Sequence, residues 1–178
     1  MQKFSSKALF LDRDGVINIE KEYLYKIKDF EFIDGIFDLC EYYQKLGYKI
    51  FVVTNQSGIA RKYYNEKDFD VLTSWMIKEF LKKGIKIEKV YHCPHHPDIS
   101  GYCDCRKPNA GMFLKAQKEF SINLKNSILV GDKESDIEAG INAGIKKTYL
   151  FNELDNVSIS KAVQIVTNLK DIINVDIK

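Results

Sequence analysis

The sequence predicts an α/β fold in which helices cover both faces of a mostly parallel β-sheet. The chain has 178 residues, which is enough for one domain around one core. Short apolar runs alternate along it with longer segments in which apolar residues recur at helical spacing. This alternation is typical of βαβ units, so we expect a Rossmann-like three-layer sandwich with no large cap domain.

The expected strands are short and rich in Val, Ile, Leu and aromatic residues. Several of them lack polar alternation, as strands that are buried on both faces do. The expected strands are Ala8–Leu11, Ile50–Thr54, Val90–His92, Ser127–Val130 and Thr148–Phe151, followed by a last apolar piece at Ala162–Val166.

The expected helices carry apolar residues three or four positions apart, which gives each helix one face for the core. They are Ile36–Lys45, Glu66–Lys83, Gly111–Phe120 and Ser135–Ala143, with a final helical turn near Leu169–Ile173. Cys40 falls on the apolar face of the first helix, so we interpret it as a core residue.

Two stretches interrupt the alternation: a flap at about residues 18–32 and a loop at about residues 93–110. The second holds all three prolines of the chain. Loops of this length within a compact domain are usually functional or held by a metal. We therefore expect residues 1–178 to form a single domain, with the flap and the loop covering its site.

Charge and hydropathy exclude several classes of partner. The net charge is only +2 with both signs interspersed, which is not the pattern of a nucleic-acid-binding protein. No apolar run approaches the roughly 20 residues that cross a bilayer, and the N-terminus lacks the features of a signal peptide. We therefore expect a cytoplasmic protein without nucleic-acid or membrane partners. The lack of an obvious exposed apolar helix face favours a monomer.

Two carboxylates follow the first expected strand. Asp12 and Asp14 stand at its carboxyl end and precede Gly15, which suits a tight turn. Ligands of open α/β sheets bind at that edge, and two neighbouring carboxylates there favour a divalent cation such as Mg²⁺. The alternative is a solvated turn, in which Asp and Gly are common.

Further polar residues follow other strands and are expected at the same edge. After the second strand come Thr54, Ser57 and Gly58, which offer a hydroxyl and backbone N–H groups to a phosphate. After the fourth strand come Asp132, Lys133 and Asp136, and Arg106 and Lys107 stand just ahead of a helix. Chance does not readily account for all of these placements together.

Cysteines and histidines cluster in the long loop. Cys93 and His95 are separated by one residue, as are Cys103 and Cys105, and the set matches a closed, structural zinc site. His92 and His96 are alternative ligands, and free thiols without a metal are the remaining interpretation. A zinc ion here would hold the loop that presents Arg106 and Lys107.

Together these motifs resemble a known family. LFLDRDGVIN, FEFIDG, VVTNQSGIAR, CPHHP, CDCRKP and VGDKESD are similar to motifs of the haloacid dehalogenase (HAD) superfamily of phosphatases, and more narrowly of bacterial heptose-bisphosphate phosphatases. The resemblance runs from about residue 8 to residue 151. It implies Mg²⁺-dependent removal of the 7-phosphate of D-glycero-D-manno-heptose 1,7-bisphosphate, a step in ADP-heptose biosynthesis for lipopolysaccharide or other surface glycans.

The resemblance also implies residue roles. Asp12 would attack phosphorus to form an aspartyl-phosphate, Asp14 would act as general acid and then base, and Thr54 and Lys107 would bind the transferring phosphoryl group. Mg²⁺ would be held by the Asp12 carboxylate, the Asp14 carbonyl and Asp132, whereas Asp136 could orient Lys107 or a metal-bound water. The implied substrate-binding residues are Arg106, Lys133, Glu20, Lys21, Glu22, Tyr23, Asn55, Gln56 and Ser57.

Two other functions remain open at this point. The same chemistry could act on histidinol phosphate, although NQSGIAR fits the heptose enzymes better. A zinc-loop binding module without turnover is the second alternative, and the intact set of Asp12, Asp14 and Asp132 argues against it. The sequence departs from the heptose family at Lys62, where the family tends to have glycine, which leaves the orientation of Arg61 open.

Overall fold

A six-stranded sheet, whose strand pairings are all parallel, forms the centre of the molecule in the computed structural model, which describes residues 5–154, 156–157 and 159–176. Its strand order is β3-β2-β1-β4-β5-β6. The strands are β1 (Ala8–Leu11), β2 (Lys49–Asn55), β3 (Ile87–Cys93), β4 (Ile128–Gly131), β5 (Lys147–Phe151) and β6 (Gln164–Val166). This confirms the expected α/β class with a parallel sheet.

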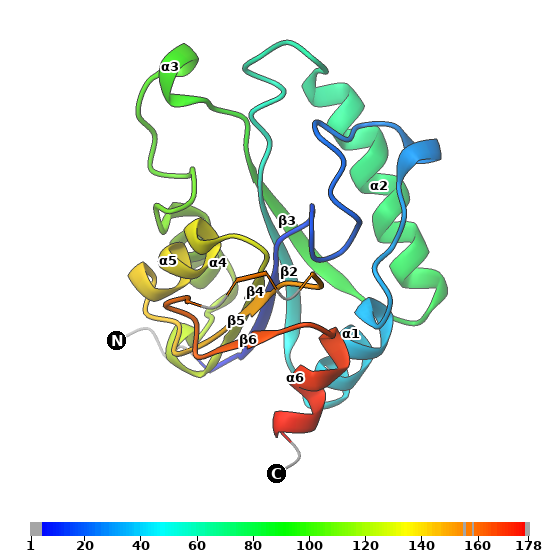
Figure 1. Ribbon diagram of the computed structural model, residues 1–178, viewed down its shortest axis with the longest axis vertical. Coiled ribbons are helices and arrows are strands. Elements are labelled where there is room, and N and C mark those ends of the chain that lie inside the picture. Colours follow the sequence, from blue (N-terminus) through cyan, green and yellow to red (C-terminus); the bar gives the residue numbers. More distant parts are fainter. Residues whose placement is uncertain (1–4, 155, 158, 177–178) are drawn as a thin grey trace.

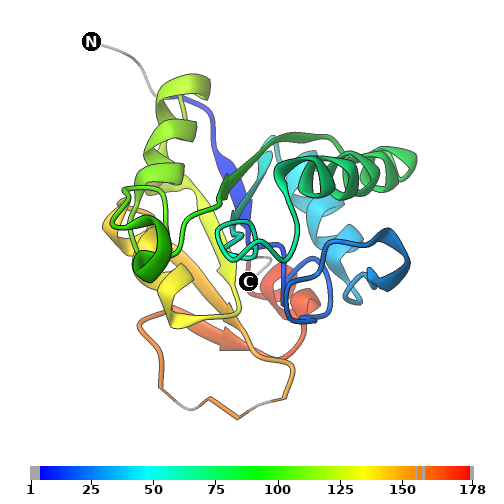
Figure 2. The same cartoon turned by 90° about the horizontal axis from the view of Figure 1, so that it is seen from above.

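Helices cover both faces of this sheet (Figures 1 and 2), which gives the three layers expected from the sequence. One face is covered by α1 (Ile36–Lys45), α2 (Glu66–Lys82) and α6 (Leu169–Asp176), and the other by α4 (Gly111–Phe120) and α5 (Glu134–Asn142). The shorter elements are the helix α3 (Pro97–Ser100) and the 3-10 turns η1 (Ile27–Asp29) and η2 (Leu124–Asn126). The described residues include no helix that is long and apolar enough to cross a membrane.

The central strand β1 shows how the sequence builds both cores. All four of its residues are fully buried, because each face of the strand meets a different helical layer. Leu9 and Leu11 pack in the core cluster that contains the apolar residues of α1, α2 and α6. Ala8 and Phe10 pack in the second cluster, with the apolar residues of α4. A strand without polar alternation is therefore the expected pattern here.

Most element boundaries agree with the sequence to within one or two residues; the exceptions are β3 and α6, which ends three residues after the expected final turn. Strand β3 begins at Ile87, three residues before the expected start. The segment contains Glu88 and Lys89, which are half-buried at the edge of the sheet. Polar residues are tolerated on an edge strand. Because they interrupt the apolar run, the sequence predicted only the second half of β3.

The flap and the long loop lie at the carboxyl edge of the sheet, above the ends of β1, β2 and β4 (Figure 1). The flap is anchored by Phe30, whose ring packs against Phe32 and Trp75 at centroid distances of 4.9 and 5.3 Å. Phe30 belongs to the buried core cluster, and the partly buried Phe32 packs against it.

Candidate active site

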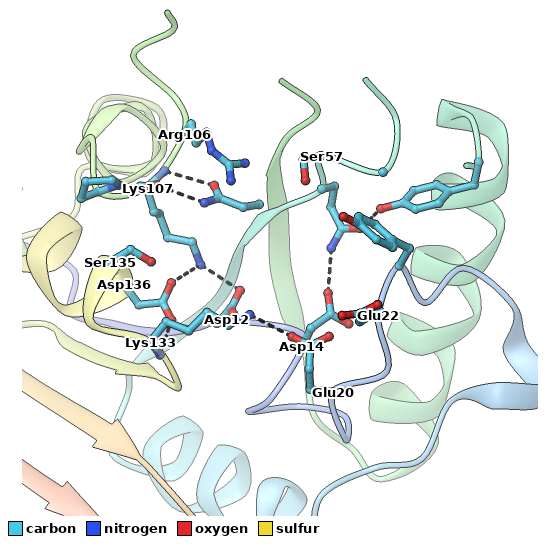
Figure 3. A pocket seen from close by; sticks show the side chains of 16 residues that line it. Asp12, Asp14, Glu20, Glu22, Ser57, Arg106, Lys107, Lys133, Ser135 and Asp136 are labelled. Carbon is cyan, nitrogen blue, oxygen red and sulfur yellow. Dashed lines mark hydrogen bonds and ion pairs between the residues drawn. The ribbon is translucent and has the colours of Figure 1, made fainter. Parts of the chain in front are cut away.

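A cavity of about 600 Å³ occupies the carboxyl edge of the sheet (Figure 3). Its walls come from the ends of β1 and β2, the flap, the long loop and the start of α5. Thirteen of the residues expected from the sequence line it: Asp12, Asp14, Glu20, Glu22, Tyr23, Asn55, Gln56, Ser57, Gly58, Arg106, Lys107, Lys133 and Asp136. Residues that lie far apart in the chain thus meet at one cavity.

A buried lysine between two carboxylates forms the floor of this cavity. Lys107 Nζ lies 2.8 Å from Asp12 Oδ1 and 2.7 Å from Asp136 Oδ1, and it also donates to the carbonyl of Val53 at 2.8 Å. All three ammonium protons therefore have acceptors. Burial raises the pKa of Asp12 to about 6, although the Lys107 charge opposes this rise. The two carboxylates in turn raise the pKa of Lys107 despite its burial, so the lysine stays charged.

Asp132 adds a third carboxylate beside this pair. The side chains of Asp12, Asp132 and Asp136 each offer an oxygen within 4.8 Å of the others. Burial, followed by the charges of Asp12 and Asp136, raises the pKa of Asp132 to about 9. Its Oδ1 atom is buried and has no hydrogen-bond partner among the described residues. A carboxylate oxygen with this cost of burial and no donor fits a site for a hard divalent cation.

Gly15 lets Asp132 approach the end of β1 so closely. Its φ angle is +89°, in the region that favours glycine. A Cβ atom at this position would lie 2.3 Å from Asp132 Oδ2, so a side chain would displace the carboxylate as well as strain the backbone. The glycine that the sequence suggested for a tight turn therefore also makes room for a candidate metal ligand.

Asp14 is surrounded by hydrogen-bond donors. Arg13 Nη2 lies 3.0 and 2.9 Å from its two oxygens, and Asn18 Nδ2 donates to Oδ1 at 3.1 Å. Gln56 Nε2 donates to Oδ2 at 2.9 Å. Arg13 is only 1% exposed and also donates to the carbonyl of Leu24 in the flap at 2.9 Å. This set orients Asp14 from three sides.

The end of β2 connects to the lysine-bearing loop through Asn55. Its Nδ2 donates to the carbonyl of Lys107, and its Oδ1 accepts from the Lys107 N–H, both at 3.1 Å. Asn55 thereby fixes the backbone of Lys107. Thr54 is buried and does not line the cavity, but its Oγ1 accepts from Gln56 Nε2 at 2.8 Å.

The expected sugar-binding residues lie at the rim with different partners. Lys133 Nζ is 2.9 Å from Glu20 Oε2, an ion pair that joins the β4–α5 loop to the flap. Tyr23 has a φ angle of 56°, and its ring packs on that of Tyr63 at 4.5 Å. Lys21 does not line the cavity: its ammonium pairs with Glu31 at 2.5 Å. This placement does not favour the expected contact between Lys21 and substrate.

The four expected zinc ligands cluster in the long loop. One ligand atom from each of Cys93, His95, Cys103 and Cys105 lies within 4.8 Å of the others. Cys103 Sγ is 3.6 Å from Cys93 Sγ and 3.5 Å from Cys105 Sγ, close to the about 3.7 Å that two thiolates span around tetrahedral zinc, whereas Cys105 Sγ lies closer to Cys93 Sγ, at 2.9 Å. The three thiols are not paired in disulfides. The donor set therefore fits zinc.

The two alternative histidines point elsewhere. His92 Nε2 lies 2.8 Å from Glu66 Oε2 on α2. His96 Nε2 lies 2.7 Å from Arg61 Nη2, so Arg61 contacts the long loop and is absent from the cavity lining. Lys62 has a φ angle of 61°, which explains why glycine suits this position.

Sequence reasoning missed Arg13, Asn18 and Tyr64 as parts of the site. Arg13 lies inside the DRDG motif and could have been found as the neighbour of two carboxylates. Tyr64 donates its hydroxyl proton to Gln56 Oε1, but it stands in a tyrosine pair that carries no motif of its own. Its role depends on a contact across the loop, which spacing does not reveal.

Comparisons with known proteins agree with this geometry. A family model described as HAD-hydrolase-like matches residues 104–150. A Campylobacter jejuni protein named D-glycero-alpha-D-manno-heptose-1,7-bisphosphate 7-phosphatase is 60% identical over 148 residues, which span 83% of this chain and 84% of the relative. The chain belongs to the heptose-bisphosphate phosphatase family of HAD hydrolases.

Other members extend this comparison. A Haemophilus influenzae protein named for the beta anomer is 46% identical over 149 residues, which span 82% of this chain and 81% of the relative. The crystal structure of a D,D-heptose 1.7-bisphosphate phosphatase from B. bronchiseptica, complexed with magnesium and phosphate, superposes with a TM-score of 0.83 at 24% identity, over 96% of this chain and 98% of that one. At that identity the likeness shows the fold.

Proposed function

We propose that this member of the heptose-bisphosphate phosphatase family removes the 7-phosphate of D-glycero-D-manno-heptose 1,7-bisphosphate. The observation that carries the proposal is the buried pair of Asp12 and Lys107 on the floor of the 600 Å³ cavity, with Asp132 beside it. The product would enter ADP-heptose biosynthesis for lipopolysaccharide or other surface glycans. The 60% identical relative is named for the alpha anomer, so we propose that anomer as the better substrate.

Asp12 is the proposed nucleophile. Its carboxylate oxygen attacks phosphorus, the bond to the sugar C7 oxygen breaks, and an aspartyl-phosphate forms. The Lys107 ammonium lies 2.8 Å from Asp12 and offsets the repulsion between this carboxylate and a phosphate dianion. Thr54 would add a hydroxyl donor to the phosphoryl oxygens. Asp136, which is bonded to the same ammonium, would hold Lys107 in place.

Asp14 is the proposed general acid and base. It would give a proton to the departing sugar alkoxide and then take one from the water that cleaves the aspartyl-phosphate. Mg²⁺, when bound, would neutralise charge between the phosphate and the carboxylates. Asp12, Asp132 and the main-chain carbonyl of Asp14 are the proposed ligands, and the unpartnered Asp132 Oδ1 supports this assignment.

Residues at the rim of the cavity are proposed to bind the sugar and its second phosphate. Arg106 and Lys133 bring positive charge to the cavity lining, to which the flap contributes Glu20, Glu22 and Tyr23. We propose that zinc held by Cys93, His95, Cys103 and Cys105 fixes the loop that carries Arg106. Arg106 Nη1 donates to the carbonyl of His95 at 3.2 Å, which supports a link between the metal site and the rim.

The organisation of the whole chain completes the proposal. We propose that residues 1–178 form one catalytic domain, with the flap at about 18–32 and the zinc loop at about 93–110 covering the site. A monomer in the cytoplasm, acting on a small sugar bisphosphate without nucleic acid or membrane, remains our prediction from composition and charge.

Phosphate release in the presence of Mg²⁺ tests this function. The substrates are the alpha and beta heptose 1,7-bisphosphates and histidinol phosphate, and we expect fast release from a heptose substrate, with the alpha anomer preferred. Asp12→Asn should abolish release while leaving the fold and the zinc content unchanged. Preference for histidinol phosphate would refute the proposed substrate. Phosphate release that Asp12→Asn does not affect would refute the proposed role of Asp12 as nucleophile. No release from any substrate would favour a binding module.

A further inference from the structure

The side chain of Gln56 forms hydrogen bonds with other residues of the site. Its side-chain amide has two protons, and Nε2 donates to Asp14 Oδ2 at 2.9 Å and to Thr54 Oγ1 at 2.8 Å. Gln56 is only 2% exposed although it borders the cavity. Because both protons are engaged, the amide nitrogen has none left to donate to a substrate. This arrangement differs from the substrate contact expected from the sequence.

Tyr64 determines which way the Gln56 amide faces. The Tyr64 hydroxyl donates to Gln56 Oε1, so the amide oxygen faces Tyr64 and the amide nitrogen faces Asp14 and Thr54. The reversed amide would direct an acceptor at the Asp14 carboxylate and repel it. Burial raises the pKa of Tyr64 to about 12, so its hydroxyl keeps the proton that it donates.

The Tyr64 ring is itself fixed from two sides. It stacks on Tyr25 of the flap with centroids 5.4 Å apart and an angle of 14° between the rings. On the other side it packs over Gly58, where an added Cβ would lie 2.2 Å from a ring carbon. The glycine of the TNQSG motif therefore admits the ring that orients the glutamine of the same motif.

We propose that Gln56, oriented by Tyr64, is a positioning residue that directs Asp14 and Thr54 toward the transferring phosphoryl group. Gln56 holds the Asp14 carboxylate on one side, and by donating to Thr54 Oγ1 it leaves the threonine hydroxyl proton free for a phosphoryl oxygen. Arg13 and Asn18 also contact Asp14, but among the described contacts Gln56 alone joins Asp14 to Thr54. The inference rests on the proposed function, in which Asp14 is the acid and base.

The test compares three variants with the wild-type enzyme containing zinc and Mg²⁺. Gln56→Glu keeps the shape and the acceptor for Tyr64 but loses the donor, Gln56→Met loses both, and Tyr64→Phe loses only the orienting hydroxyl. We expect kcat to fall about 100-fold in the Gln56 variants and about tenfold in Tyr64→Phe, because positioned acid–base catalysis contributes 10²–10⁴-fold. KM should stay within about twofold, since binding of the substrate is retained.

A second readout separates positioning from a general loss of structure. Release of the leaving group in the first turnover should slow more with the heptose bisphosphate than with p-nitrophenyl phosphate, because the sugar alkoxide needs a proton from Asp14 and the nitrophenolate does not. Tyr91→Phe is the matched control: Tyr91 is also buried, and its hydroxyl donates to Glu119 at 2.7 Å, away from the cavity. It should keep the wild-type kcat.

The outcomes are distinct. A raised KM with unchanged kcat in the Gln56 variants would overturn the inference and make Gln56 a substrate ligand. Wild-type kcat in Tyr64→Phe would also overturn it, and this variant decides the matter if the Gln56 variants do not fold, as judged by zinc content and thermal unfolding. Failure of the wild-type enzyme on every heptose bisphosphate would instead refute the proposed function, and p-nitrophenyl phosphate would then carry the comparison.

Discussion

Replacing Lys107 by methionine should both destabilise the protein and stop its chemistry. The side chain is 1% exposed, and its ammonium has three acceptors: Asp12 Oδ1 at 2.8 Å, Asp136 Oδ1 at 2.7 Å and the Val53 carbonyl at 2.8 Å. Methionine fills much of the same volume but provides no charge and no donor. Two carboxylates would therefore remain buried without their counter-ion.

The size of the effect follows from this burial. Removing one partner of a buried ion pair costs about 3–5 kcal/mol, and we expect the free energy of unfolding to fall by about that amount without added Mg²⁺. Asp136 also accepts the N–H groups of Asp132 and Lys133, at 3.2 and 3.0 Å, which keeps the loss from being larger. Loss of the donor to the phosphoryl group should lower kcat at least about 100-fold.

Urea unfolding and steady-state kinetics of Lys107→Met measure these two effects. Adding Asp136→Asn to the variant should recover part of the stability, because one uncompensated charge disappears, but none of the activity. Lys89→Met is the control: Lys89 pairs with Glu119 at 2.7 Å on the surface, so its loss should cost less than about 1 kcal/mol. Equal stability losses for Lys107→Met and Lys89→Met would refute the argument from burial.

Four further predictions concern the metal sites and the backbone. Asp132→Asn should raise the thermal midpoint at neutral pH in the absence of Mg²⁺, because burial raises the pKa of Asp132 to about 9 and ionisation of this carboxyl then favours the unfolded chain, a cost that an amide does not carry. It should also abolish turnover and the stabilisation by Mg²⁺, and an unchanged response to Mg²⁺ would exclude Asp132 as a ligand. Gly15→Ala should lower stability and weaken Mg²⁺ dependence, since its Cβ would lie 2.3 Å from Asp132 Oδ2; a wild-type Mg²⁺ titration would contradict this. Cys105→Ser should reduce the zinc content below about one per chain and lower kcat/KM, as measured by metal analysis and kinetics. Full activity in zinc-free protein would refute the proposed structural role of zinc in the long loop. Lys62→Gly should be neutral or stabilising by up to about 1 kcal/mol, because the φ angle of 61° suits glycine, and a clear loss in urea unfolding would contradict it.

The sequence was informative wherever a motif follows a buried strand. Apolar strands such as Ala8–Leu11 are buried on both faces, so a short apolar run without polar alternation predicts such a strand. Because the strands are parallel, their carboxyl ends bring Asp12, Thr54 and Asp132 to the same edge of the sheet. Cysteine and histidine spacing likewise anticipated the four-residue cluster, because few other structures bring these side chains together. These features depend on the local sequence pattern and on the rule that the carboxyl ends of parallel strands lie at one edge of the sheet.

Other features depend on contacts that no local pattern encodes. Lys21 turns to Glu31 within the flap, and Gln56 turns to Asp14 and Thr54, although both stand in motifs expected to contact substrate. The first half of β3 carries charged residues because it lies at the sheet edge, which requires the strand order to be known. A motif shows that a residue belongs to the site, whereas its partner emerges only in three dimensions.

Phosphorus NMR of the reaction with Mg²⁺ shows which of the two phosphates of the substrate the enzyme removes. The substrate, a heptose 1,7-bisphosphate, carries two phosphates with distinct signals, one on the anomeric carbon and one on C7. We expect the C7 signal to be replaced by inorganic phosphate while the anomeric signal persists, and Asp12→Asn to leave both signals unchanged. Loss of the anomeric phosphate, or no change with the wild-type protein, would contradict the proposed function.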